Sequence, residues 1–91
     1  MYQQEVVIMN RSGLHARPAA EFARAAALFR SDVQLLHKEQ IINAKSIINI
    51  LAGGLIKGTE IIIRAEGPDE IMAVEILKQM IECGIGEAEE S

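Results

Sequence analysis

The sequence predicts an α+β fold, in which four antiparallel strands and three helices follow in the order βαββαβα as a two-layer open-faced sandwich. Three observations predict it. Segments rich in β-branched residues alternate with segments of helical periodicity. A chain of 91 residues has room for one core, so one sheet is expected with all three helices on one face. Hydrophobic residues make up 49% of the chain, which argues against intrinsic disorder.

The first half of the chain is predicted to contribute a strand, a helix and a hairpin. Residues 5–9 are rich in β-branched side chains and end at a turn-forming cluster. Residues 16–29 are rich in alanine and repeat apolar positions at helical spacing, which predicts an amphipathic helix that lies close to a sheet. Residues 33–36 and 41–43 are predicted as the two strands of a hairpin, in which His37 is expected to be an exposed polar residue.

The second half is predicted to contribute a short helix, a strand and a longer helix. Residues 45–51 fit a short helix that two following glycines end. Residues 60–66 alternate between two faces and give the clearest strand pattern. Residues 67–70, with a proline and two acids, are expected to open the last helix.

The length and composition of the chain limit its domain organisation and its location in the cell. Residues 1–84 are expected to form one domain, and residues 85–91 a flexible acidic tail. The single cysteine, Cys83, excludes an internal disulfide and multi-cysteine zinc sites, and it is expected in or near the core. No secretory signal is visible, and the longest uncharged run, residues 46–56, is too short to cross a bilayer. A cytoplasmic protein is therefore expected.

The charge is distributed unevenly. The net charge is −4, but residues 1–58 carry seven basic and four acidic residues, whereas residues 59–91 carry two basic and nine acidic residues. A net acidic chain with 3% aromatic residues lacks the features of a nucleic-acid binder. The basic portion favours a surface for an anionic group. The alternative is that the acids only solvate the last helix and the tail.

Residues 13–20, Gly-Leu-His-Ala-Arg-Pro-Ala-Ala, join the first strand to the first helix and form the candidate site. Pro18 does not destabilise the first helical turn, because an N–H at this position would have no intrahelical partner. The backbone N–H groups of Ala16 and Arg17, with the positive end of the helix dipole, form an anion site. The Arg17 guanidinium suits phosphate oxygens. His15 is the candidate nucleophile, through Nδ1, for transient binding of a phosphoryl group.

At this motif the chain resembles the HPr family, the histidine-containing phosphocarriers of the bacterial phosphoenolpyruvate-dependent sugar phosphotransferase system. The resemblance extends over about residues 2–84 and includes the segments 43–46, 57–59 and 65–67. It implies that His15 accepts a phosphoryl group from phosphorylated enzyme I and donates it to IIA domains of sugar permeases. It also implies that Arg17 stabilises the phosphate and that Pro18 shapes the helix start. Such a protein is a carrier and not an enzyme, and no cofactor or metal is expected.

Ser46 has two interpretations. It is a favoured residue for capping the short helix. The resemblance implies a second role, because a kinase/phosphorylase modifies the matching serine of many family members and thereby controls transfer and transcriptional regulators. The following residues, 47–54, depart from the regulated pattern, with Asn49 in place of a small residue. A specialised regulatory or nitrogen-branch paralogue, acting as a phosphorylation-dependent effector, therefore stays open beside the transport role.

The short helix also predicts a docking surface. Its four large apolar residues cover an arc of roughly 160°, wider than the ~100° that a core-facing stripe needs, so Ile48 and Ile50 cannot both be fully buried. Ile47, Ile48 and Leu51 are the candidates for an exposed partner-binding patch. The alternative is that all of them pack inside. Arg24, two helical turns after Arg17, either extends the positive rim or is ordinarily solvated.

A monomer with acidic protein partners is expected from these features. The remaining alternative is an interaction module of the same fold without phosphotransfer.

Overall fold

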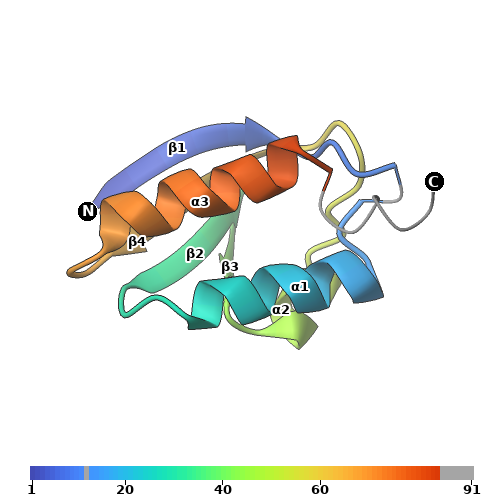
Figure 1. Cartoon of the computed structure of the whole chain (residues 1–91). Coiled ribbons are helices and arrows are strands. Elements are labelled where there is room, and N and C mark those ends of the chain that lie inside the picture. The colour runs from blue at the N-terminus through green and yellow to red at the C-terminus, as the bar shows by residue number, and fades with distance from the viewer. Residues whose placement is uncertain (12, 85–91) are drawn as a thin grey trace.

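A four-stranded antiparallel sheet in the order β1-β4-β2-β3 forms one layer of the molecule (Figure 1). The computed structural model describes residues 1–11 and 13–84. The strands are β1 (Tyr2–Val7), β2 (Asp32–His37), β3 (Gln40–Asn43) and β4 (Glu60–Glu66). The helices are α1 (Ala16–Ala27), α2 (Ile47–Ala52) and α3 (Glu70–Glu82). In Figure 1, α1 and α3 cross the same side of the sheet, with α2 beside α1. The predicted fold class and element order are confirmed.

Strand alternation and small helical residues build the core. In β4, Ile61, Ile63 and Ala65 are buried against the helices, as the alternation predicted. The buried face of α1 is mainly alanine around one large side chain, Phe22, which is fully buried. Alanines let α1 approach the sheet closely, so Phe22 fills the space that remains.

Some predicted boundaries were wrong at the ends of elements. The first strand begins at Tyr2 rather than residue 5, because Tyr2 pairs with Ala65 at the far end of β4. It ends at Val7 rather than residue 9, although the Ile8 N–H still donates to the Thr59 carbonyl at 2.9 Å. Helix α1 ends at Ala27 rather than at residue 29.

The ends of α2 and α3 also differ from the prediction. Helix α2 begins at Ile47 rather than at residue 45, since the preceding residues form a turn in which the Ser46 N–H donates to the Asn43 carbonyl at 3.1 Å. Helix α3 begins at Glu70, so Pro68 precedes the helix instead of opening it.

Two single-residue expectations were also wrong. Cys83 is exposed, because it follows the last inward-facing residue of α3, Ile81, at the end of the helix. His37 is half-buried instead of exposed, and its Nδ1 atom is buried with no hydrogen-bond partner among the described residues. The hairpin turn follows directly, with Lys38 at a positive φ of 55°. The predicted tail, residues 85–91, lies outside the described residues.

Within residues 1–11 and 13–84, no helix has the length and apolar composition needed to cross a bilayer.

A reciprocal set of hydrogen bonds joins two distant turns. The Asp69 carboxylate accepts from the Arg30 N–H at 2.9 Å, and from the N–H and Oγ of Ser31 at 3.0 and 2.5 Å. The Asp69 N–H donates back to Ser31 Oγ at 3.2 Å. Ser31 is buried, so its polar atoms depend on these bonds. The hydrogen bonds from Ser31 and then from Arg30 lower the pKa of Asp69 below its ordinary value of 3.8.

Asp69→Asn is expected to lower the thermal unfolding midpoint at pH 7 by roughly 5–10 °C. An amide NH₂ would point a donor at groups that are themselves donors. Folding lowers the pKa of Asp69. Its contribution to the free energy of unfolding is therefore complete above pH 3.8 and is lost as the pH falls through the pKa of the folded state. The difference between wild type and variant should therefore shrink as the pH falls below 3.8, and thermal scans at pH 7 and in acid measure it.

Asp32→Asn is the matched control, because this exposed aspartate has no hydrogen bond comparable to those of Asp69 among the bonds described above. A difference between wild type and Asp69→Asn that stays constant into acid would contradict the prediction.

Candidate functional site

The loop before α1 is tied to the loop that follows α2. The Gly13 N–H donates to the Asn10 carbonyl at 3.0 Å, and the Leu14 N–H donates to the Leu55 carbonyl at 2.8 Å. Gly13 has a positive φ of 71°, and a Cβ there would overlap the Leu55 carbonyl oxygen. Leu14 is buried and anchors the loop in the core. These contacts fix the backbone that leads into His15.

His15 is the N-cap of α1, with extended backbone angles of φ −91° and ψ −163°. Its carbonyl accepts the first helical hydrogen bond, from the Ala19 N–H at 2.8 Å. Its side chain makes no capping hydrogen bond and is exposed. The ring is therefore carried at the helix N-terminus without being used to stabilise the helix.

The first turn of α1 is electropositive. The N–H groups of Ala16 and Arg17 lie in the first turn, before the first N–H that can donate to a carbonyl of the same helix. Pro18 lies buried in this turn, at a position whose N–H would have no intrahelical acceptor. The turn contains no acidic residue, so nothing in it offsets the helix dipole. The structure thus brings His15, Ala16, Arg17 and Pro18 together, as predicted.

Arg24 shares a helix face with Arg17 at a rise of about 10 Å, and both are exposed. Arg24 lies in the last turn of α1, where a cation is favourable to the helix. It extends a positive surface along α1 but lies outside the first turn that surrounds His15.

Ser46 caps α2, as predicted. Its Oγ accepts from the Asn49 N–H at 3.2 Å and from the Asn49 side-chain Nδ2 at 3.2 Å. The adjacent Lys45 Nζ donates to the Phe29 carbonyl at 3.0 Å, which joins the start of α2 to the chain after α1. Asn49 thus occupies both acceptor positions of the Ser46 hydroxyl.

An exposed apolar patch lies on α2. Ile50 is fully buried, whereas Ile48 is 77% exposed and both Ile47 and Leu51 are 42% exposed. The predicted exposure of these three residues is confirmed. Sequence reasoning missed Ile56, which is 66% exposed and packs beside Gly13 in the loop before α1. A single apolar residue in a loop has no periodicity that could have revealed it. We call Ile47, Ile48, Leu51 and Ile56 the apolar patch.

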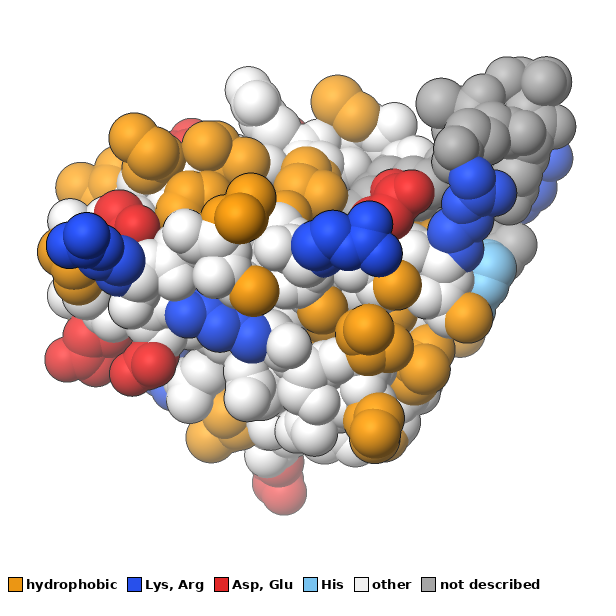
Figure 2. Space-filling model, turned by 60° about the horizontal axis from the view of Figure 1, so that its bottom comes forward, with side chains coloured by type: hydrophobic (Ala, Val, Ile, Leu, Met, Phe, Trp, Pro, Cys, Tyr) orange, Lys and Arg blue, Asp and Glu red, His pale blue; other side chains and the backbone are white. Residues whose placement is uncertain are grey.

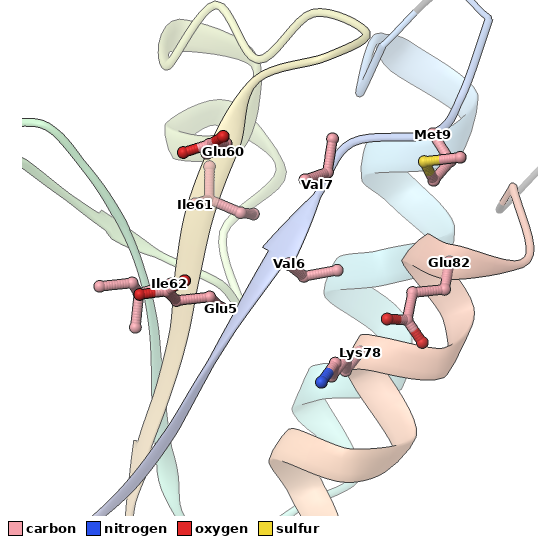
Figure 3. A pocket seen from close by; sticks show the side chains of 9 residues that line it. All are labelled: Glu5, Val6, Val7, Met9, Glu60, Ile61, Ile62, Lys78 and Glu82. Carbon is pink, nitrogen blue, oxygen red and sulfur yellow. The ribbon is translucent and has the colours of Figure 1, made fainter.

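The apolar patch and the basic side chains surround one end of the molecule. Figure 2 shows basic side chains close to a group of hydrophobic ones on one face of the molecule. Two grooves lie away from His15, the first of them shown in Figure 3, although Ile48 of the apolar patch lines the second. One of about 460 Å³ is lined by β1, β4 and α3, and another of about 290 Å³ by β3 and α2. His15 lines neither groove, and its side chain is exposed.

This geometry can hold a small anion against a nucleophile. Backbone N–H groups and the Arg17 guanidinium suit the peripheral oxygens of a phosphoryl group, and an imidazole nitrogen suits attack on phosphorus. Among residues 1–11 and 13–84, no three His, Cys, Asp or Glu side chains gather as a metal site requires.

Known sequences are similar to this chain over most of its length. The family described as "PTS HPr component phosphorylation site" matches residues 2–83. The phosphocarrier protein HPr of Buchnera aphidicola (from Schizaphis graminum) is 44% identical over 81 residues, covering 89% of this chain and 95% of the relative. The phosphocarrier protein HPr of Vibrio cholerae is 39% identical over 82 residues, covering 90% and 96%.

Solved structures are similar to this chain as well. HPr of Thermoanaerobacter tengcongensis superposes with a TM-score of 0.91 at 39% identity, covering 96% of this chain and 98% of the other. The Bacillus subtilis catabolite repression protein Crh superposes with a TM-score of 0.75 at 39% identity, covering 93% and 98%, and its structure is a swapped dimer.

Proposed function

The chain belongs to the HPr family of phosphotransferase-system phosphocarriers, and we propose that it accepts a phosphoryl group on His15 from phospho-enzyme I and donates it to IIA domains of sugar permeases. The observation that carries this proposal is the exposed His15 ring at the N-cap of α1, beside a first turn without acidic residues.

The transfer is a single displacement at phosphorus. The lone pair of His15 Nδ1 attacks, the Nδ1–phosphorus bond forms, and the bond from phosphorus to the donor breaks with its electron pair leaving on the donor. The Ala16 and Arg17 N–H groups and the Arg17 guanidinium hold the three peripheral oxygens. Donation to a IIA domain reverses these roles. The group must stay labile, so the site holds it without binding it tightly.

The chain therefore acts as a carrier, and its partners supply the catalysis. Incubation with enzyme I and phosphoenolpyruvate, followed by intact-mass measurement, tests the proposal. An acid-labile gain of one phosphoryl group is expected. A wild-type protein that gains none would overturn the proposal and revive the interaction module without phosphotransfer.

Partner docking is assigned to the apolar patch together with the basic side chains of α1. An exposed apolar group next to the nucleophile excludes water when a partner covers it. Arg17 and Arg24 favour partners with acidic surfaces around their own phosphorylated residue. We place this carrier as a monomer in the cytoplasm, where enzyme I presents its phosphorylated residue and a IIA domain presents its acceptor.

Leu51→Glu is expected to raise the KM for phosphoryl transfer from enzyme I by about tenfold or more, because a carboxylate would be desolvated in an apolar contact. The fold should be unchanged, since Leu51 is 42% exposed and buried Ile50 anchors α2. Initial rates against carrier concentration measure the effect.

Ile71→Glu is the matched control, because it places the same charge on another exposed apolar helix position, 59% exposed in the first turn of α3. Equal KM values for the two variants would remove the apolar patch from the docking surface.

A regulatory role is the second candidate function, and the likeness to Crh, a catabolite repression HPr, favours it. Ser46 is the proposed regulatory residue. A phosphate there would keep an acceptor at the start of α2 but would place negative charge beside the apolar patch. Treatment with an HPr kinase and ATP tests this role, since acid-stable labelling that Ser46→Ala removes would support it. Absence of labelling leaves the transport role.

A further inference from the structure

The Ser46 hydroxyl accepts hydrogen bonds from two donors of one residue. Its Oγ accepts from the backbone N–H of Asn49 and from the Asn49 side-chain Nδ2, each at 3.2 Å. A serine that only caps a helix accepts from one backbone N–H, and the second lone pair of its oxygen stays available. In this chain the carboxamide of Asn49 takes that second lone pair. The acceptor capacity of the hydroxyl is therefore filled.

The backbone around Ser46 explains why the carboxamide bonds to the hydroxyl. Asn49 is the third residue of α2, a position from which the Glu or Gln of a capping box reaches back to the N–H of the N-cap residue. Here the Ser46 N–H already donates to the Asn43 carbonyl at 3.1 Å. The side chain of Asn49 is also shorter than that of Glu or Gln. Its Nδ2 therefore donates to the nearer Ser46 Oγ.

The carboxamide has more freedom to leave this contact than the hydroxyl has. The Ser46 N–H is bonded to Asn43, and the Ser46 carbonyl accepts from the N–H of the fully buried Ile50 at 3.1 Å. Ser46 is half-buried, whereas Asn49 is exposed. Asn49 also lines two grooves of about 290 and 330 Å³. Its side chain can rotate into open space, while the backbone holds Ser46 in place.

Phosphorylation of a serine requires a free lone pair on its oxygen. The lone pair of Oγ attacks the γ-phosphorus of ATP and the Oγ–phosphorus bond forms. The bond from phosphorus to the bridging oxygen breaks, and its electron pair leaves on ADP. The hydroxyl proton passes to a base of the kinase. With both lone pairs of Ser46 Oγ engaged, one hydrogen bond has to break before this attack.

We propose that the Asn49 carboxamide restrains phosphorylation of Ser46, because it must rotate off Oγ before the hydroxyl can attack. Asn49 is in this sense a positioning residue that acts through Ser46. The inference rests on the proposed regulatory role of Ser46 and is independent of the carrier role of His15. Its consequence is a chain that stays unmodified at a kinase activity sufficient to modify a chain with a small residue at position 49.

Asn49→Ala is expected to raise kcat for phosphorylation of Ser46 by about threefold to tenfold, the factor that corresponds to one ordinary hydrogen bond. KM should be unchanged, because the variant alters the reacting hydroxyl. The backbone N–H at position 49 still caps Ser46, and alanine is at least as favourable in a helix as asparagine. Initial rates of acid-stable labelling by HPr kinase and ATP measure the effect on the full chain, without enzyme I. The kinase is first shown to be active on its own HPr substrate.

Two further variants separate the lost donor from other effects. Asn49→Leu keeps a side chain of similar size without a donor, so it should raise kcat as Asn49→Ala does. Gln40→Ala is the matched control, because it removes a carboxamide from another exposed residue of the groove of about 290 Å³. Among the described residues, both donors to Ser46 Oγ belong to Asn49. Gln40→Ala should therefore leave kcat unchanged.

The contact itself can be measured by NMR on the wild-type chain without a kinase. A separation of 3.2 Å between Asn49 Nδ2 and Ser46 Oγ places the side-chain amide protons close to the Ser46 Hβ protons. Nuclear Overhauser contacts between these protons are expected. Their absence would overturn the proposal independently of any labelling.

The labelling rates also decide between the possible failures. Equal kcat values for wild type and Asn49→Ala, with both labelled, would overturn the restraint and leave the regulatory role of Ser46 standing. Absence of labelling in every variant would overturn the restraint and the regulatory role together. An increase that Asn49→Leu does not share would assign the effect to side-chain size, and a change in KM alone would assign it to docking. Either result would overturn the proposal, whereas labelling of Asn49→Ala beside an unlabelled wild type would support it.

Discussion

His15→Ala is expected to abolish phosphoryl acceptance from enzyme I, with no acid-labile mass gain after incubation with phosphoenolpyruvate. The imidazole supplies the only nucleophilic nitrogen at the start of α1, and alanine leaves the N–H groups and Arg17 without an atom to receive the phosphoryl group. The fold should persist, because the His15 side chain is exposed and makes no capping bond. The unfolding free energy should stay within about 0.5 kcal/mol of wild type.

His37→Gln is the matched control for this variant. His37 is the other histidine of the chain, and it lies at the end of β2, away from α1. The control should be phosphorylated like wild type. Retention of an acid-labile group by His15→Ala, or its loss from His37→Gln with the fold intact, would assign the acceptor to another residue.

Gly13→Ala is expected to affect both stability and transfer. The positive φ of 71° is unfavourable for alanine, and the new Cβ would overlap the Leu55 carbonyl oxygen, which already accepts from the Leu14 N–H. The loop must shift, so the unfolding free energy should fall by about 2–4 kcal/mol. Because a displacement of about 1 Å at a reacting group can cost about a hundredfold in rate, kcat/KM for phosphorylation should fall at least tenfold.

Gly54→Ala separates the effect of backbone strain from the effect of displacing the loop before α1. Gly54 also has a positive φ, 64°, but a Cβ there meets no atom within 4 Å. It should cost about 1 kcal/mol of stability and leave the transfer rate unchanged. Chemical denaturation and initial rates on both variants measure the two effects. Equal rates for the two variants would mean that contact with the Leu55 carbonyl does not position His15.

Local patterns were sufficient where the structure depends on neighbouring residues. The alternation in residues 60–66 predicted β4 at its observed bounds, and the residues around Pro18 predicted His15 at a helix start. The apolar arc of α2 predicted which of its residues lie outside the core, because helix geometry alone limits what one face can bury.

The features that the sequence did not predict depend on contacts between residues far apart in the chain. β1 begins at Tyr2 because β4 continues to Ala65, a residue 63 positions later in the chain. The bonds between Ser31 and Asp69 join turns 38 positions apart, and neither turn carries a local signal for the other. The half-buried His37 and exposed Cys83 depend on where the sheet and α3 end. The roles of Ser46 and of the apolar patch await the experiments above.

The open placement of His15 has a consequence for selectivity. An exposed ring contributes few contacts with which to discriminate among small phosphorylated metabolites or to exclude the surrounding water. Under the proposed function, each partner protein would supply the remaining contacts around the phosphoryl group. The choice of donor and acceptor would then depend on the partner protein, so that, under the proposed function, one carrier would serve several permeases without a change in its own site.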